Sequence, residues 1–177
     1  YAANFSKEEL LEAIDYAHLF HKKIYLTVNT LIKQSELLEM VDYLRPYYEA
    51  GLDGIIIQDL GVFALIQNFF PELEIHISTQ MTITSSYGAI FMKELGASRI
   101  VPARELTLEE IKIIKRKCNI EIETFIHGAM CYSYSGACLF SSMLGGRSGN
   151  RGRCAQPCRL SYQVICPENK NISGSKE

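Results

Sequence analysis

The stretch DGIIIQDLGVFALIQNFFPELEIHIST, residues 53–79, has the pattern of one strand–helix–strand unit. DGIIIQD (53–59) and LEIHIST (73–79) are short apolar runs, as expected for parallel strands that are covered on both faces. GVFALIQNFF (61–70) lies between them and is predicted to be a helix. A strand, a helix and a second strand in this order predict two parallel strands joined by a crossover helix.

The same pattern repeats on both sides of this stretch. Further strands are predicted at KIYLTVNT (23–30), ASRIVPA (97–103) and IEIETFIHG (120–128). Further helices are predicted at 6–22, 36–51, 86–96 and 108–117. Repeated strand–helix units predict an α/β fold, either a doubly wound sheet or a (β/α) barrel. No GxGxxG turn follows any strand, which weakens the dinucleotide-binding version of the doubly wound fold.

Local signals predict where several helices begin and end. Two pairs have the spacing of a capping box: Ser6 with Glu9, and Thr107 with Glu110. Ser35 is expected to cap the helix at 36–51, Pro46 to kink or break that helix, and Gly51 to end it.

Composition and charge limit the class of protein. A chain of 177 residues with 47% hydrophobic residues can bury the core of one globular domain. The net charge of −2 argues against capture of nucleic acid or an anionic membrane by the whole surface, although a local basic patch remains open. No run approaches the ~18 apolar residues of a transmembrane helix, so no membrane association is expected.

The visible pattern is shorter than a complete barrel. Five strands are predicted, whereas a barrel needs eight, and the chain begins at Tyr1 rather than at a methionine. We therefore expect a fragment of a larger protein with sequence missing at both ends. Residues 1–166 are predicted to be a partial TIM-barrel-like (β/α) repeat of about five parallel strands with helices, ending in a Cys- and Gly-rich loop region at 127–159. Residues 167–177 are predicted to be a polar tail or the start of a further segment.

Polar side chains recur where the predicted strands end. They are Asn29, Gln58 and Asp59, Ser78 and Gln80, Arg104 and Glu105, and Glu123 and His127. Barrel enzymes build their sites at the carboxyl ends of the strands, so these positions predict one shared functional face.

Four of the six cysteines gather near the end of the chain, in HGAMCYSYSGACLFSSMLGGRSGNRGRCAQPCR (127–159). Their spacing is Cys131-x6-Cys138-x15-Cys154-x3-Cys158. The two CxxC knuckles usual in structural zinc sites are absent, while irregular wide gaps suit a [4Fe–4S] cluster held by four thiolates. Zinc, disulfides, a nucleophilic cysteine paired with His127, and burial without a ligand remain open. Such a local group favours a reducing compartment, and hence a cytoplasmic protein.

The residues around these cysteines suggest two further roles. Six glycines would let the backbone wrap a cluster: Gly128, Gly136, Gly145, Gly146, Gly149 and Gly152. Four arginines fall within thirteen positions that contain no Asp or Glu: Arg147, Arg151, Arg153 and Arg159. A basic patch is therefore expected, and Arg147, Arg151 and Arg153, with Asn150 beside them, are candidate contacts for the phosphates of a nucleic acid, although arginines solvated on a loop would look the same.

The segment ETFIHGAMCYSYSGACLFS (123–141) resembles the signature of the U32 peptidase family, also called collagenase-like peptidases. Phe140 departs mildly from it, since an aliphatic residue is usual there. Further blocks in the same order also look like the family: NFSKEEL (4–10), LTVNT (26–30), ISTQMTIT (77–84), VPAREL (101–106) and GGRSGNRGRCAQPCR (145–159). The resemblance covers residues 4 to about 163, and residues 145–162 look closest to long bacterial members that include a ribosomal-RNA branch.

The resemblance implies a TIM-barrel-like domain whose opening strands precede this chain. It implies that Cys131, Cys138, Cys154 and Cys158 hold a [4Fe–4S] cluster. Several members act in oxygen-independent hydroxylation of a tRNA wobble uridine, a 23S rRNA cytidine or the ubiquinone ring, and the RNA branches depend on prephenate. Some members work as pairs.

Three hypotheses follow, of which an iron–sulfur-dependent RNA hydroxylase leads. Glu123 or His127 would move a proton, Arg104 would bind a carboxylate such as that of prephenate, and Glu105 would line the same pocket. The alternative is a peptidase acting on a peptide substrate, for which Cys131 is the conceivable nucleophile because the chain has no HExxH pair and no GxSxG elbow. The third hypothesis is a non-catalytic module that stabilises a partner subunit.

Overall fold

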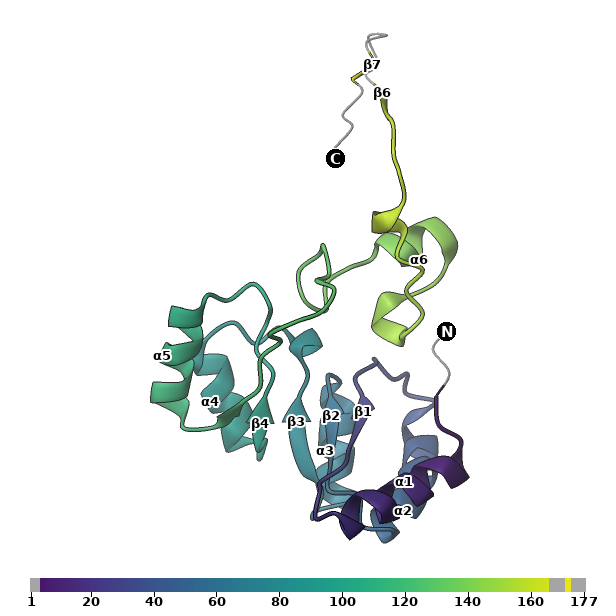
Figure 1. The fold of residues 1–177 in the computed structure, drawn as a ribbon, viewed down its shortest axis with the longest axis vertical. Coiled ribbons are helices and arrows are strands. Elements are labelled where there is room, and N and C mark those ends of the chain that lie inside the picture. The colour runs from purple at the N-terminus through teal and green to yellow at the C-terminus, as the bar shows by residue number, and fades with distance from the viewer. Residues whose placement is uncertain (1–3, 166–170, 173–177) are drawn as a thin grey trace.

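The computed structural model describes residues 4–165 and 171–172, and it contains a five-stranded parallel sheet (Figure 1). The strands are β1 (Tyr25–Val28), β2 (Gly54–Ile57), β3 (Glu74–Ile77), β4 (Arg99–Ile100) and β5 (Glu121–Ile122). Their order in the sheet is β1-β2-β3-β4-β5, and each neighbouring pair is parallel. The predicted α/β fold with about five parallel strands is confirmed.

Helices connect the strands along the chain. They are α1 (Lys7–Leu19), α2 (Leu37–Glu49), α3 (Leu60–Phe69), α4 (Ser86–Glu94) and α5 (Leu108–Cys118), with the short α6 (Phe140–Gly145) following β5. Strands that lie in sequential order and are joined by right-handed crossovers receive all their helices on one face of the sheet. A doubly wound fold reverses its strand order to cover both faces, so the observed order is that of a barrel-type sheet. The sheet formed by the described residues is open rather than closed into a barrel.

The two faces of the sheet differ in chemistry. Ile57, Ile77 and Ile100 lie in register, are fully buried, and join one core cluster with residues of α1 to α5. The adjacent row points the other way and places His76 beside Arg99. His76 is itself fully buried, and burial lowers the pKa of its imidazole, which favours the neutral ring. The strands are thus apolar mainly toward the helices, and cover of the opposite face, where His76 is already buried, stays a prediction.

The predicted helix ends are mostly confirmed. Both capping boxes are present, Ser6 with Glu9 at α1 and Thr107 with Glu110 at α5. Gly51 follows α2 with φ of +89°, the left-handed conformation that glycine adopts without strain. The prediction for Ser35 is wrong, because Glu36 occupies the N-cap position and no side chain caps the helix.

Pro46 does not break α2. The helix runs through it to Glu49, within one turn of the proline. Only one intrahelical hydrogen bond lacks its donor there, and the buried side chains Leu44 and Tyr47 on either side keep the turn packed against the core.

The last predicted strand is much shorter than its sequence pattern indicates. Strand β5 ends at Ile122, and residues 123–139 have no helix or strand. Phe125 and Ile126 are exposed, so burial does not hold this segment extended against the sheet. His127 therefore lies in an irregular segment rather than at a strand end, which corrects the prediction for 120–128.

The chain after the cysteines is described only in part. Strand β6 (Val164–Ile165) pairs antiparallel with β7 (Asn171–Ile172). Cys166 and most of the predicted tail at 167–177 lie outside the described residues. Among the residues that the structure covers, no helix combines the length and apolarity needed to cross a membrane.

Candidate functional site

The Cys- and Gly-rich segment at 127–159 lies over the carboxyl ends of the strands, shown in Figure 1 by α6 and the chain around it. The Leu31 amide, after β1, donates a hydrogen bond of 2.8 Å to the Asn150 carbonyl. The Gln58 side chain, after β2, donates from Nε2 to the carbonyls of Asn29 at 2.6 Å and Asn150 at 3.4 Å. Three of the predicted site residues, Asn29, Gln58 and Asn150, thus take part in joining the segment to the sheet.

Ser135 is the second attachment point and has no exposed surface. Its amide donates to Glu105 Oε1 at 2.9 Å, and its hydroxyl accepts from the Arg104 amide at 3.3 Å. Its carbonyl accepts from the Thr82 hydroxyl at 2.7 Å. Because the Glu105 carboxylate accepts a hydrogen bond from the Ser135 amide, it holds the cysteine segment in position. The sequence pattern carries no signal for Ser135, because a serine among small residues looks like ordinary loop composition.

Gly136 makes the closest backbone approach in this region. Its φ is +72°, and a Cβ added there would lie 1.9 Å from the carbonyl oxygen of Gln80. Only glycine permits this contact, because any side chain would overlap the backbone of the neighbouring turn. Gln80 thereby fixes the cysteine segment through its backbone, and it also lines the four-cysteine cavity described below.

Arg151 forms a bidentate ion pair with Glu36, in the turn before α2. The distances are 2.7 Å from Nη1 to Oε2 and 2.6 Å from Nη2 to Oε1, and Nη1 also donates to the Leu31 carbonyl at 2.9 Å. Hydrogen bonding to Arg151 is the main cause that lowers the pKa of Glu36 from 4.5 to about 2. Both terminal nitrogens of Arg151 are thus used within the protein, which leaves the prediction that it binds phosphate without support.

Glu36→Gln is expected to loosen the cysteine segment and lower the stability of the protein at neutral pH. The folded state favours the ionised carboxylate, so its contribution is full above pH 4.5 and is lost as the pH falls toward about 2. The stability difference between wild type and variant should therefore shrink across that window. Urea unfolding at several pH values measures it, with Glu39→Gln, an exposed glutamate of the same helix, as the matched control. Equal stability of wild type and Glu36→Gln at pH 7 would contradict the assignment.

All four clustered cysteines line one cavity of about 750 Å³, and each is a free thiol. Cys138 Sγ accepts a hydrogen bond from the Phe140 amide at 3.4 Å, and Cys154 Sγ accepts one from the Gln156 amide at 3.3 Å. Amide hydrogen bonds of this kind stabilise thiolates and tune iron–sulfur centres. Within the described ranges, no three His, Cys, Asp or Glu side chains are close enough to bind one metal ion. A four-iron cluster binds each thiolate at a different iron, so its ligands are spread more widely than those of a single zinc.

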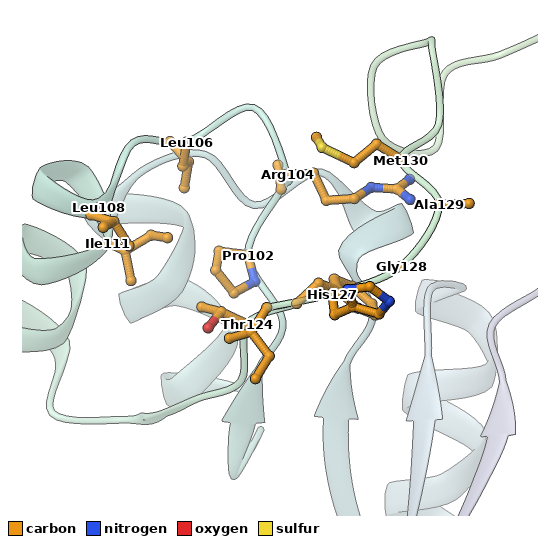
Figure 2. Close-up of a pocket in the computed structure, with 13 residues that line it drawn as sticks. Pro102, Arg104, Leu106, Leu108, Ile111, Thr124, His127, Gly128, Ala129 and Met130 are labelled. Carbon is orange, nitrogen blue, oxygen red and sulfur yellow. The ribbon is translucent and has the colours of Figure 1, made fainter.

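A second cavity of about 520 Å³ adjoins the first (Figure 2). One wall comes from the chain after β4 and from α5, with Leu106, Leu108 and Ile111, and the other comes from residues 124–130. Arg104 lines both cavities, whereas His127 lines only this second one. The predicted catalytic residues Arg104 and His127 are therefore brought to one place.

Three other predicted site residues, Glu123, Asp59 and Ser78, make contacts within the protein. Glu123 lines neither cavity and forms an ion pair with Arg99 at 3.3 Å. Asp59 caps α3 through Oδ1, and its Oδ2 accepts from the Ile32 amide at 3.0 Å. Ser78 is buried and accepts from the Gln80 amide. These roles follow from the polar end of each strand, where turns and caps also need oxygen acceptors.

The arginines of the predicted basic patch differ in how far their side chains are exposed to solvent. Arg147 is half-buried, and its Nε donates to the Arg153 carbonyl at 3.3 Å. Arg153 is exposed. Of the three arginines predicted to contact RNA, Arg153 is therefore the most open to solvent.

The amino-acid sequence is similar to those of known proteins. The chain is 38% identical over 170 residues to the tRNA hydroxylation protein P1 of Bacillus subtilis (strain 168), covering 96% of this chain and 40% of that protein. It is 38% identical over 174 residues to the 23S rRNA 5-hydroxycytidine synthase of Escherichia coli (strain K12), covering 98% of this chain and 26% of that protein. The chain thus spans less than half the length of either relative.

The fold and the family also match. A solved structure of a U32 peptidase aligns with a TM-score of 0.56 and 18% identity, over 67% of this chain and 51% of that one, and this likeness concerns the fold alone. The model of peptidase family U32 matches residues 1–177. With a family match over every residue and relatives of 38% identity, the chain belongs to peptidase family U32.

Proposed function

We propose that this chain is the cluster-binding part of an enzyme that hydroxylates RNA, with tRNA or 23S rRNA as substrate. The observation that carries the proposal is the single cavity lined by Cys131, Cys138, Cys154 and Cys158. The names of the Bacillus and Escherichia relatives supply the reaction class and the two RNA substrates. Reduced thiols and an RNA substrate both favour the cytoplasm as the location of the proposed enzyme.

The donor set fits a [4Fe–4S] cluster. Four free thiols line one space, two of them already accept amide hydrogen bonds, and nearby turns use Gly146 and Gly152 in the left-handed conformation. When bound, the cluster would supply one-electron chemistry beside the substrate. The protein supplies the thiolates, the amides that favour their charge, and a rigid attachment to the sheet.

Arg104 and His127 are the proposed reaction-pocket residues. Arg104 borders both cavities, so its guanidinium can bind the carboxylate of a small co-substrate, such as prephenate, next to the cysteines. His127 lies on the wall of the same pocket and is proposed to hold or move a proton. The apolar residues Leu106 and Ile111 line the opposite wall of this pocket.

We infer that the sheet belongs to a closed (β/α) barrel in the complete protein. The sequential strand order supports this, as does the full burial of His76 on the face away from the core. In such a barrel the cysteine segment caps the end where enzymes of this fold carry their sites. We also keep as a proposal that the protein works together with a partner subunit.

Nucleoside mass spectrometry of tRNA and ribosomal RNA tests the function. A strain that lacks the gene is expected to lose one hydroxylated uridine or cytidine, and the wild-type gene is expected to restore it. Unchanged RNA in the deletion strain would contradict the proposal.

The peptidase alternative predicts a different result. Among the described residues, His127 and Cys131 line different cavities and share no hydrogen bond, so the geometry of a nucleophile and its base is lacking. Cleavage of gelatin by an iron-free preparation of the protein would favour that alternative.

A further inference from the structure

We propose that Tyr132, Phe140 and Tyr162 form a stacking platform for unpaired RNA bases at the rim of the four-cysteine cavity. The three rings and Cys158 line a hollow of about 400 Å³ that shares part of its wall with that cavity. The inference rests on the proposed function, and it names the form of RNA that the site accepts, a single strand or loop.

The rings are available to a ligand and partly fixed in place. Tyr132 is 91% exposed, Tyr162 58% and Phe140 38%. The ring centroids of Phe140 and Tyr162 are 6.1 Å apart, with 36° between their planes. The Tyr162 hydroxyl donates to the Pro157 carbonyl at 2.8 Å, which holds its ring beside the turn that carries Cys158. A partly immobilised aromatic ring loses little entropy when a base stacks on it.

Charge favours a nucleic acid as the occupant. Residues 127–163 contain no Asp or Glu, and they contain four arginines, of which Arg151 is paired with Glu36. Arg159 directly follows Cys158, and Arg153 is exposed directly before Cys154. Aromatic rings and arginines in one acid-free segment match the two parts of a single strand, its bases and its phosphates.

The platform also has a defined relation to the cysteines. Tyr132 directly follows Cys131, and Phe140 lies two residues after Cys138. The Phe140 amide donates a hydrogen bond to the Cys138 sulfur. Tyr132, Phe140 and Cys158 line both this hollow and the four-cysteine cavity. A base stacked here would lie at the rim of the four-cysteine cavity. Paired bases in a duplex cannot reach these rings, so the arrangement selects unpaired nucleotides.

Fluorescence binding with a single-stranded RNA that contains 2-aminopurine tests the inference in the complete protein. Tyr132→Ala and Phe140→Ala are each expected to weaken binding by about 5- to 150-fold, the loss that one stacked base represents. Tyr132→Phe keeps the ring and should bind within about threefold of wild type. Tyr87→Ala removes an exposed aromatic on α4, far from the segment in sequence, and serves as the matched control. A duplex of the same sequence should bind more weakly and respond little to Tyr132→Ala.

Iron content and thermal unfolding of each variant establish that the fold and cluster are retained. Wild-type affinity in both alanine variants would overturn the stacking platform while leaving the proposed function intact. Loss of affinity in Tyr132→Phe would equally overturn it, since the hydroxyl rather than the ring would then bind. A wild-type protein that carries its cluster but binds none of these RNAs would instead contradict RNA as the substrate.

Discussion

Cys154→Ala is expected to reduce bound iron and sulfide by more than about tenfold, since loss of one ligand costs at least as much as loss of a residue that supports a ligand. Cys154 lines the common cavity, and its sulfur accepts the Gln156 amide. In the proposed enzyme, one iron of the cluster would then lack its protein ligand, and RNA hydroxylation should fall with the iron content. Anaerobic purification followed by iron analysis and UV–visible and EPR spectra measures the loss.

Cys118→Ala is the matched control. Cys118 is buried at the end of α5, where burial raises the pKa of its thiol and keeps it neutral, and it lines none of the cavities around the cysteine segment. This variant should keep its iron. The same experiment separates the cluster from a nucleophile, because a cluster requires all four cysteines whereas a nucleophilic mechanism requires only Cys131. Retained activity in Cys154→Ala together with its loss in Cys131→Ala would favour the nucleophile.

Gly136→Ala is expected to detach the cysteine segment from the sheet. The left-handed conformation costs a residue with a Cβ about 1–2 kcal/mol. The added carbon would also lie 1.9 Å from the Gln80 carbonyl oxygen, so the backbone must move, and overpacking of this kind costs about 1–3 kcal/mol. Together these terms predict destabilisation by about 2–5 kcal/mol. Faster hydrogen exchange at Ser135 and a lower iron content should accompany it, because the Ser135 amide would lose its bond to Glu105.

Gly145→Ala provides the comparison for this variant. Gly145 lies in the same segment, in α6, and a Cβ added there meets no atom within 4 Å. It should unfold and bind iron like the wild type. If Gly136→Ala and Gly145→Ala had the same stability and iron content, the close contact with Gln80 would not control the docking of the segment.

Much of the fold was predictable because its signals are local. The apolar runs at β2 and β3, the capping boxes at Ser6 and Thr107, and the glycine after α2 each act within one or two turns of chain. The end of β5 was not predictable in this way. ETFIHG has strand-like alternation, but its apolar side chains Phe125 and Ile126 are exposed among the described residues, and pairing stops at Ile122.

In the candidate site, too, some features were predictable from local sequence and others were not. The four-cysteine set was visible in the sequence because the four thiols fall in one short acid-free segment, and all four line one cavity. Polar residues at strand ends predicted the site less well. Asp59 and Ser78 cap helices, and the Glu105 carboxylate accepts a hydrogen bond from the Ser135 amide. A carboxylate in such a position has the same sequence context whether it binds a ligand or a backbone amide.

The sequence by itself determined the alternation of strands and helices, the family and the identity of the four thiols, because each depends on residue type and short spacing. Only the tertiary structure decided that Arg151 pairs with Glu36 across 115 positions and that Gly136 lies against Gln80. It also showed that Arg104 borders both cavities. Contacts between distant parts of the chain depend on how the strand ends are brought together, and no local pattern encodes that geometry.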